Sequence, residues 1–305
     1  MKIFVTGGNG FLGKSLCKKL IEVGHEVIAP SSKECNLFNY SNLEKFNNES
    51  FDIIYHLAAW TQAGDFCLKH PGEQWINNQK INTNILEWWF NSNKKSKLIF
   101  MGTSCSYSPG IDMIEDNYMD GEPIDSLYTY AMTKRMLLQG ARALEKQFNM
   151  NWLCFVPSTL YGPDYHTDGR QMHFIFDLIR KIIRAKEYGE EVVLWGDGEQ
   201  KREIVHVYDF INNSLKLSNR YSNEIINLGY GEEFSIKFFA NEICKVVDYD
   251  FKKIKFDTSK YVGAKSKCLN IDKVSKYLPK YKDNLTSTFA GMSKTIDWFY
   301  ENKAY

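Results

Sequence analysis

A tyrosine and a lysine, Tyr130 and Lys134, begin a segment whose apolar residues recur at helical spacing over residues 128–147. Residues four apart share a helix face, so the ammonium would lie beside the phenol. A nearby ammonium favours the phenolate and lowers the tyrosine pKa from its usual value of about 10. We therefore expect Tyr130 to act as a general acid or base, although an amphipathic helix can carry the same pair by chance.

A glycine-rich run, GGNGFLG at residues 7–13, follows a strand pattern at residues 2–6 and precedes a helical pattern that stops at Gly24. A strand, a glycine loop and a helix in this order let backbone N–H groups approach a diphosphate. The context predicts a dinucleotide-binding unit rather than a plain turn. The cofactor-binding residues expected in this loop are Gly7, Gly10, Phe11, Leu12 and Gly13.

The second predicted strand, residues 26–29, has no carboxylate at its end. An NAD site usually places Asp or Glu there for the ribose 2′-hydroxyl, whereas an NADP site uses hydroxyl and basic groups. Glu34 follows only a few residues later, so NADP(H) is favoured and NAD(H) is not excluded. The residues expected to bind the cofactor on this side are Ser31, Ser32, Lys33, Asn36 and Leu37.

A third strand pattern, residues 51–57, ends at Ala58 and Ala59, which are small enough for a cofactor to lie against the backbone. His56 inside this strand is expected to be a core histidine rather than a ligand. The next helix, predicted over residues 73–91, carries three asparagines among apolar residues. A buried asparagine here could brace the sheet or hold an active-site water, and solvated surface is an equal alternative for each; they are Asn78, Asn82 and Asn84.

A fourth strand pattern, residues 97–101, leads into the run GTSC at residues 102–105. Ligands of doubly wound sheets bind outside the carboxyl ends of the strands, so these hydroxyls and the thiol would face the site. Thr103 is expected to hydrogen-bond a substrate carbonyl or hydroxyl beside Tyr130.

The order of these elements predicts an α/β fold: a doubly wound (Rossmann) parallel sheet with a second, smaller α/β substrate-binding domain. A return strand is expected at residues 225–229, and helices over residues 235–247 and from residue 271 onward are assigned to the second lobe. We assign residues 1–162 and 207–230 to the dinucleotide-binding domain, and residues 163–206 and 231–305 to the nucleotide-sugar-binding domain.

Composition argues against several partners. Lys+Arg 38 against Asp+Glu 37 leaves a formal net charge of +1, which gives no footprint for nucleic acid or a membrane surface. No apolar run reaches the ~18 residues of a membrane span, and the first residues lead into a strand rather than a signal peptide. From the lack of a span and of a signal peptide we expect a cytoplasmic protein. The seven scattered cysteines contain no C-x-x-C pair and the six histidines show no metal spacing, so we expect neither a disulfide framework nor a metal site.

These motifs resemble the extended short-chain dehydrogenase/reductases, and within them the GDP-L-fucose synthase family. The resemblance runs over nearly the whole chain. Beyond the group-wide signals it includes Cys105, His173, the run PSTLYGP at residues 157–163 and the run from Trp195 to His206. It implies an NADP-dependent oxidoreductase that acts on a GDP-linked 4-keto sugar in nucleotide-sugar biosynthesis for surface glycans such as capsule or lipopolysaccharide.

The resemblance also implies roles for individual residues. Tyr130 would donate a proton during hydride transfer to C4, while Lys134 tunes it and holds the nicotinamide ribose. Cys105 and His173 would serve as base and acid for epimerisation beside the ketone, with Thr103 holding the enolate. The remaining implied contacts are Pro157 to the cofactor, Thr159 to the sugar, Trp195 to the base or ribose, and Arg202 and Lys267 to the nucleotide.

The chain departs from the family at several positions. The family's catalytic serine is Thr103, an asparagine is replaced by Thr159, the loop 164–172 shares little beyond its length, and the arginines that read a 2′-phosphate are missing. A C4 reductase without epimerisation, acting on a GDP-4-keto-(6-deoxy)heptose or another NDP-4-keto sugar, therefore stays open. Weaker alternatives are a 4,6-dehydratase, an NAD-retaining 4-epimerase and a non-catalytic NADP-binding sensor.

The resemblance further implies a homodimer built on two helices, residues 76–91 and 128–148. Trp88, Trp89 and Leu137 would suit either that surface or the core.

Overall fold

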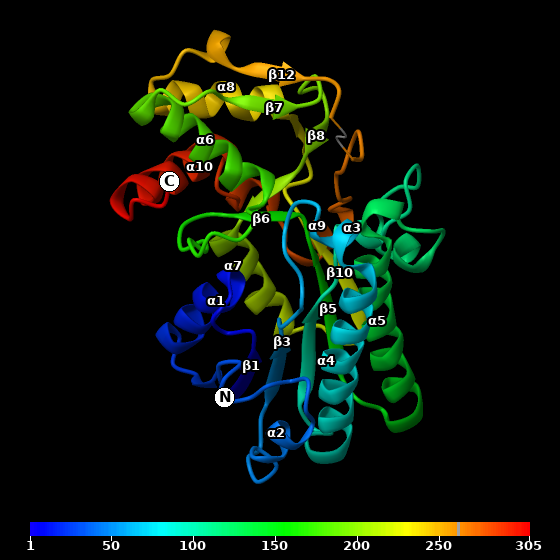
Figure 1. The fold of residues 1–305 in the computed structure, drawn as a ribbon. Helices are drawn as coiled ribbons and strands as arrows, with labels where there is room; N and C mark the ends of the chain where they lie inside the picture. Colours follow the sequence, from blue (N-terminus) through cyan, green and yellow to red (C-terminus); the bar gives the residue numbers. More distant parts are fainter. Residues whose placement is uncertain (261–262) are drawn as a thin grey trace.

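The computed structural model describes residues 1–260 and 263–305. Its centre is a parallel six-stranded sheet in the order β10-β5-β4-β3-β1-β2 (Figure 1). Because the strand order reverses between β1 and β3, the sheet is doubly wound, which confirms the predicted fold class. The strands are β1 (Lys2–Thr6), β2 (Glu26–Ile28), β3 (Ile53–His56), β4 (Lys97–Met101), β5 (Trp152–Pro157) and β10 (Glu224–Leu228).

Helices cover both faces of this sheet. Alternating residues of β1 point to opposite faces, so Phe4 joins the core under one helix pair, while Ile3 and Val5 join the core under the other. In Figure 1, α4 and α5 lie side by side on one face and α1 and α7 on the other. These helices are α1 (Phe11–Glu22), α4 (Pro71–Ser92), α5 (Tyr128–Phe148) and α7 (Val207–Ser218).

The helix that carries Tyr130 and Lys134 ends one residue beyond its predicted limit, because Asn149 adopts the left-handed conformation with φ 56° and closes it. Trp88, Trp89 and Leu137 are all fully buried against the sheet. The sequence left open whether these side chains lie on a dimer surface or in the core, and the structure places all three in the core.

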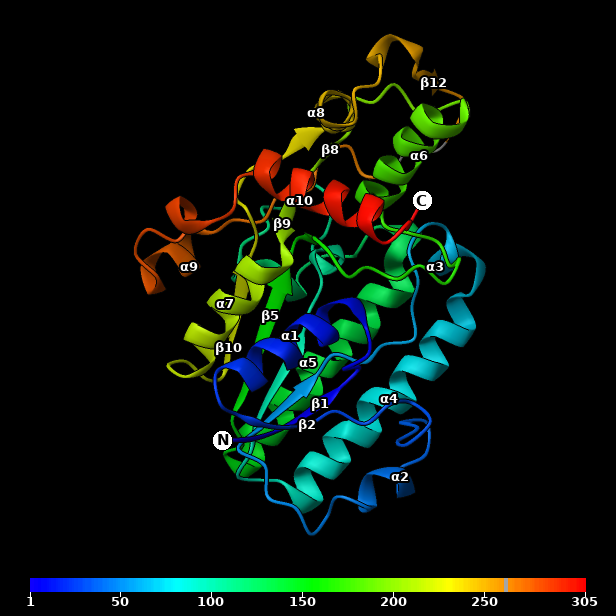
Figure 2. The same cartoon turned by 90° about the vertical axis from the view of Figure 1, so that its left-hand side faces the viewer.

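A second lobe lies beyond the carboxyl ends of the strands, with its own apolar core (Figure 2). Its longer helices are α6 (Phe174–Tyr188), α8 (Ile236–Val247) and α10 (Thr288–Glu301). Its short strand pairs are β6 (Thr159–Tyr161) with β9 (Ile204–His206), β7 (Val193–Trp195) with β12 (Lys255–Asp257), and β8 (Lys201–Arg202) with β11 (Phe234–Ser235). The other elements are helices α2 (Ser41–Glu44) and α3 (Phe66–Lys69), and 3-10 turns η1 (Ser104–Ser106), η2 (Glu115–Met119), η3 (Asp125–Leu127), η4 (Phe251–Lys253) and η5 (Lys282–Asn284).

One helix lies elsewhere than the sequence suggested. The segment from residue 271 onward was expected to form helices of the second lobe, but α9 (Asp272–Tyr277) packs against β10 at the edge of the main sheet. Its buried Val274 joins the same core as Ile226 and Leu228 of that strand. Periodicity marks a buried helix face but does not say which core covers it.

Candidate functional site

The glycine loop forms an open cradle between β1 and the start of α1. Gly7 has φ +70°, and a Cβ there would lie 2.8 Å from Ala58 N. A Cβ on Gly13 would lie 2.1 Å from Gly7 O, so the tight turn tolerates only glycine. With side chains kept out, the loop N–H groups and the N-terminus of α1 can meet a diphosphate, so the residues fit a dinucleotide.

A cavity of about 430 Å³ opens from this cradle along the ends of β1, β2 and β3. Eight of the predicted cofactor residues line it: Gly7, Gly10, Ser31, Ser32, Asn36, Leu37, Ala58 and Ala59. Lys33 does not, and Glu34 turns its carboxylate to Ser31, accepting hydrogen bonds from the backbone N and from Oγ at 2.8 Å each. Sequence reasoning missed Arg170, which reaches the cavity from the second lobe.

His56 is a satisfied core histidine, as expected. Its ring is fully buried and hydrogen-bonds Thr6 Oγ1 at 2.8 Å on one side and Asn82 Oδ1 at 3.1 Å on the other. Burial, with the charge of Lys134 nearby, lowers its pKa to about 4, so the ring is neutral at pH 7. Asn82 Nδ2 also donates to Thr133 O at 3.2 Å, which ties the strand beside the glycine loop to the helix that carries Lys134.

The other two asparagines of α4 brace the rim of the cofactor cavity. Asn78, which is buried, accepts from Trp60 N at 2.9 Å and donates to Trp60 O at 3.0 Å. Asn84 donates to Leu37 O at 2.7 Å. All three asparagines therefore hydrogen-bond protein backbone; Asn78 and Asn82 are buried, whereas Asn84 is half-buried and keeps some solvent-exposed surface.

Tyr130 and Lys134 lie one turn apart on α5, with Lys134 Nζ 5.9 Å from the Tyr130 ring centroid. The expected lowering of the tyrosine pKa is wrong: burial, with the thiols of Cys105 and Cys67 nearby, raises the pKa of Tyr130. The physical reason is that loss of solvation penalises the phenolate. Burial also lowers the pKa of Lys134 to about 8. At pH 7 the phenol is thus protonated and ready to donate.

Thr103 and Cys105 follow β4 at the carboxyl end of the sheet. Thr103 Oγ1 accepts from Cys105 N at 3.2 Å and caps η1, which leaves its hydroxyl proton free to reach a ligand. Lys267 Nζ lies 2.9 Å from Cys105 Sγ. Burial alone would raise the thiol pKa, but the charge and hydrogen bond of Lys267, with Thr103, leave the pKa of Cys105 below its ordinary value.

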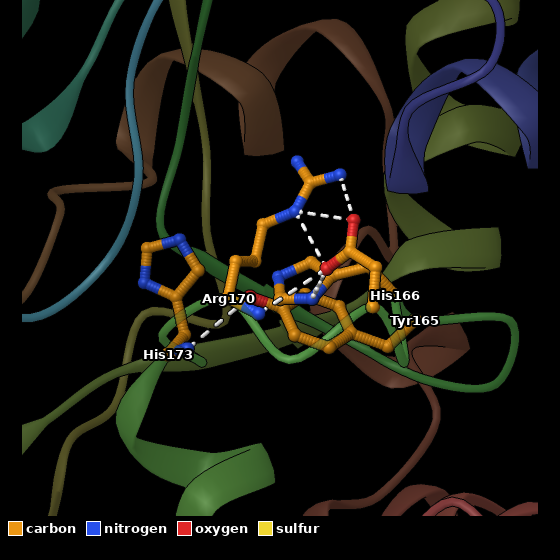
Figure 3. A network of polar contacts seen from close by, with 5 residues as sticks. Tyr165, His166, Arg170 and His173 are labelled. Carbon is orange, nitrogen blue, oxygen red and sulfur yellow. Dashed lines mark hydrogen bonds and ion pairs between the residues drawn. The ribbon is translucent and has the colours of Figure 1, made fainter.

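His173 caps the N-terminus of α6 and borders a polar network in the loop before it (Figure 3). Its backbone N–H donates to Tyr165 Oη at 3.2 Å. Protein packed around the ring, with His166 and Lys267 nearby, lowers the pKa of His173 to about 4, although the residue keeps exposed surface. His173 is therefore neutral at pH 7 and must take up a proton before it can act as an acid.

The second lobe supplies the remaining predicted residues. Arg202, half-buried on β8, donates through Nη1 to Lys201 O and Ala264 O at 2.7 Å each. Trp195 ends β7 with 55% of its surface exposed, and Thr159 begins β6. The structure brings Lys267 to Cys105, whereas among residues 1–260 and 263–305 no side-chain hydrogen bond joins Trp195 or Thr159 to the other site residues.

Glu203 is a functional candidate that sequence reasoning left out of the site. It is 3% exposed, and its two oxygens accept from Gly231 N at 2.6 Å and Leu269 N at 2.9 Å. Burial raises its pKa to about 7. The carboxylate thus anchors the segment that carries Lys267. In the sequence, the only feature that pointed to Glu203 was its position next to Arg202.

The described part of the chain shows neither a metal-binding cluster nor a membrane-spanning helix. No three His, Cys, Asp or Glu side chains there are grouped so as to hold a metal ion. Across residues 1–260 and 263–305, no helix is long and apolar enough to cross a membrane.

Known proteins resemble this chain over nearly its whole length. The chain is 28% identical to the GDP-L-colitose synthase of Yersinia pseudotuberculosis over 310 residues, covering 99% of both chains. It is 27% identical to the GDP-L-fucose synthase of Escherichia coli K12, covering 99% of this chain and 97% of that one. A GDP-L-fucose synthetase from Naegleria fowleri solved with NADP superimposes with a TM-score of 0.86 at 25% identity, covering 99% and 94%.

The profile of the NAD dependent epimerase/dehydratase family matches residues 3–229, which span the cradle, the cavity and the Tyr130 helix. The chain belongs to the NAD dependent epimerase/dehydratase family.

Proposed function

We propose that the chain catalyses NADPH-dependent reduction at C4 of a GDP-linked 4-keto sugar, coupled to epimerisation beside the ketone. The observation that carries this proposal is the 2.9 Å contact between Lys267 Nζ and Cys105 Sγ near Tyr130. Reduction needs Tyr130 and Lys134 but no thiolate, so an activated thiol at the same place points to proton abstraction. The relatives named GDP-L-fucose and GDP-L-colitose synthase support the GDP-sugar class.

The glycine cradle and its cavity would hold the dinucleotide, which when bound supplies the hydride for C4. No carboxylate among the described residues lines that cavity, and hydroxyls of Ser31 and Ser32 do, which supports NADP(H) over NAD(H). The Naegleria protein solved with NADP supports the same choice. Five other predicted cofactor residues do not line the cavity and stay proposals: Phe11, Leu12 and Gly13 on the glycine-loop pattern, Lys33 on its place after the second strand, and Pro157 on the resemblance.

Reduction at C4 leaves a negative charge on the former carbonyl oxygen. Tyr130 donates its proton to that oxygen, since its raised pKa keeps it protonated at pH 7. Lys134, with a pKa of about 8, is mainly charged and stabilises the phenolate that remains. The Thr103 hydroxyl donates a hydrogen bond to the same oxygen, keeps its own proton, and holds the ketone in place.

Epimerisation starts from a C–H bond next to the ketone. The Cys105 thiolate removes that proton, and hydrogen bonds from Thr103 and Tyr130 stabilise the enolate. His173 returns a proton to the opposite face after taking one from solvent, because it is neutral at rest. The nucleotide is held from the second lobe by Arg202 and Lys267, with Thr159 and Trp195 toward the sugar and base.

The proposal includes the setting of the enzyme. Residues 1–162 and 207–230 form the dinucleotide domain, and residues 163–206 and 231–305 the nucleotide-sugar domain, with α9 docked on the first. The seven free cysteines fit a reducing, cytoplasmic compartment. A homodimer forms through α4 and α5, where Trp75, Ile76 and Met136 are exposed apolar side chains.

The test is turnover of GDP-4-keto-6-deoxymannose with NADPH in D₂O, with the product examined by NMR. We expect NADPH consumption and deuterium at C3 and C5. Reduction without deuterium would leave a C4 reductase and reduce Cys105 and His173 to substrate contacts. If no NADPH is consumed, the hexose assignment is wrong, and 4-keto heptoses or other NDP-4-keto sugars are tested next.

A further inference from the structure

The loop at residues 164–172 bridges the second lobe and the cofactor cavity. At its start, the Tyr165 ring stacks on Phe176 with centroids 3.6 Å apart. It also packs edge-to-face with Phe11 of the glycine run, with centroids 5.1 Å apart. Near its end, Gln171 Nε2 donates to Asp65 Oδ1 at 3.1 Å, and Asp65 lies in the segment between β3 and α3. Both ends of the loop are thus attached to the rim of the dinucleotide domain.

Arg170 lies between these two attachments and lines the cavity. It is the only charged residue among the described residues that do so; the others are glycines, hydroxyl-bearing, amide, thiol or apolar residues. The family's arginines for a 2′-phosphate are missing from this chain, and Lys33 does not line the cavity. Among the described residues that line the cavity, a bound dinucleotide phosphate would meet one cationic side chain, Arg170, which belongs to the second lobe.

The guanidinium is held in place by Asp168. Arg170 Nε donates to Asp168 Oδ1 at 2.9 Å and Oδ2 at 2.8 Å, and Nη2 donates to Oδ2 (Figure 3). Within residues 1–260 and 263–305, Nη1 of Arg170 has no hydrogen-bond partner. A guanidinium carries five N–H donors in a rigid fork, so one edge can stay on the carboxylate while another binds an anion.

We propose that Arg170 is a phosphate-binding residue for the dinucleotide, placed over the cavity by the bridging loop of the second lobe. The proposal rests on the proposed NADP(H) dependence of the enzyme. Two phosphate groups could meet the free edge: the diphosphate at the glycine cradle or the 2′-phosphate near Ser31 and Ser32. Their chemistry is the same, and cofactors with and without the 2′-phosphate distinguish them.

The direct test is binding of the cofactor alone, without sugar substrate, to the full-length protein. Dissociation constants for NADPH and NADH are measured by calorimetry for the wild type, Arg170→Gln and Arg170→Lys. Arg184→Gln is the matched control, because Arg184 also pairs with a carboxylate through Nε and Nη2, that of Glu190, but does not line the cavity. Losing one charge-assisted bond to phosphate should weaken NADPH binding about tenfold in Arg170→Gln.

The lysine variant should recover part of this loss, and Arg184→Gln should bind as the wild type does. The salt dependence of NADPH affinity should also be shallower in Arg170→Gln, which a purely structural defect would not produce. Equal weakening for NADPH and NADH assigns Arg170 to the diphosphate, and weakening for NADPH alone assigns it to the 2′-phosphate.

Wild-type affinity of Arg170→Gln for both cofactors would overturn the inference and leave the proposed function intact. If the wild type binds neither cofactor, the proposed function fails and this inference fails with it.

Discussion

Removing the ammonium of Lys267 should raise the pKa of the Cys105 thiol. Lys267 Nζ lies 2.9 Å from Cys105 Sγ, and its charge and hydrogen bond offset the burial that would otherwise raise the thiol pKa. In Lys267→Met the thiol keeps its burial and loses the ammonium that contributes most to stabilising its charged form. At any pH below the Cys105 pKa of both the wild type and the variant, a smaller fraction of Cys105 is then present as thiolate.

The size of the effect follows from the contact. A hydrogen bond to a charged group contributes about 1.5 to 3 kcal/mol, and because both residues are only partly buried we take the lower limit. About 1.5 kcal/mol corresponds to roughly tenfold less thiolate. A thiolate of higher pKa is a better nucleophile, with a Brønsted coefficient of about 0.4 to 0.5, so alkylation slows only about threefold to fourfold.

The assay is iodoacetamide labelling of Cys105 across pH, followed by mass spectrometry of its peptide. Cys105 should react first, because burial raises the pKa of each of the other six cysteines. The midpoint of the profile is the readout, since a shorter side chain also changes access to the thiol. Lys265→Met, an exposed lysine on the same segment, is the control. An unchanged midpoint in Lys267→Met would refute the reasoning.

Three further outcomes follow from the buried groups. Tyr130→Phe should lower kcat by about 10² to 10⁴ and leave the dissociation constant for NADPH unchanged, measured by steady-state kinetics and calorimetry. Lys134→Met should abolish turnover yet stabilise the protein at pH 7 by up to about 3 kcal/mol in urea unfolding, because burial lowers the pKa of Lys134 from 10.5 to about 8. That gain should shrink between pH 8 and 10.5, where the unfolded chain holds more protons than the folded one. Glu203 has the opposite sign: its pKa is raised from 4.5 to about 7, so its contribution to stability is present below pH 4.5 and lost as pH rises through 7. The free energy of unfolding of the wild type relative to Glu203→Gln should therefore fall over that window, and a flat difference would contradict the assignment.

Local patterns predicted most of the framework. The glycine run, the strand ends and the spacing of Tyr130 and Lys134 are short-range features, and the sheet order follows from βαβ connections that pack in one hand. His56 could be placed in the core because it stands inside an apolar run. The docking of α9 against β10 could not be predicted, because the apolar face of this helix would suit the core of either lobe.

The electrostatics of the site depended on contacts that no spacing reveals. The pKa of Tyr130 follows burial rather than the lysine four residues away, because solvation loss grows with all surrounding protein. Lys267 meets Cys105 from 162 residues along the chain. Arg170 lies in a loop whose sequence carries no motif, and the contacts of Tyr165 and Gln171, which help to hold that loop over the cavity, join residues far apart in the chain.

The position of β10 has a consequence for synthesis on the ribosome. This strand pairs with β5, yet the residues of the second lobe from 163 to 206 are made between them. At the usual 5 to 20 residues per second, the edge of β5 waits roughly 3 to 13 s for its partner. An apolar strand with an unpaired edge, such as β5 before β10 is made, can pair with a strand of another chain. Fragments that end before Glu224 should therefore aggregate, while the full chain stays dispersed.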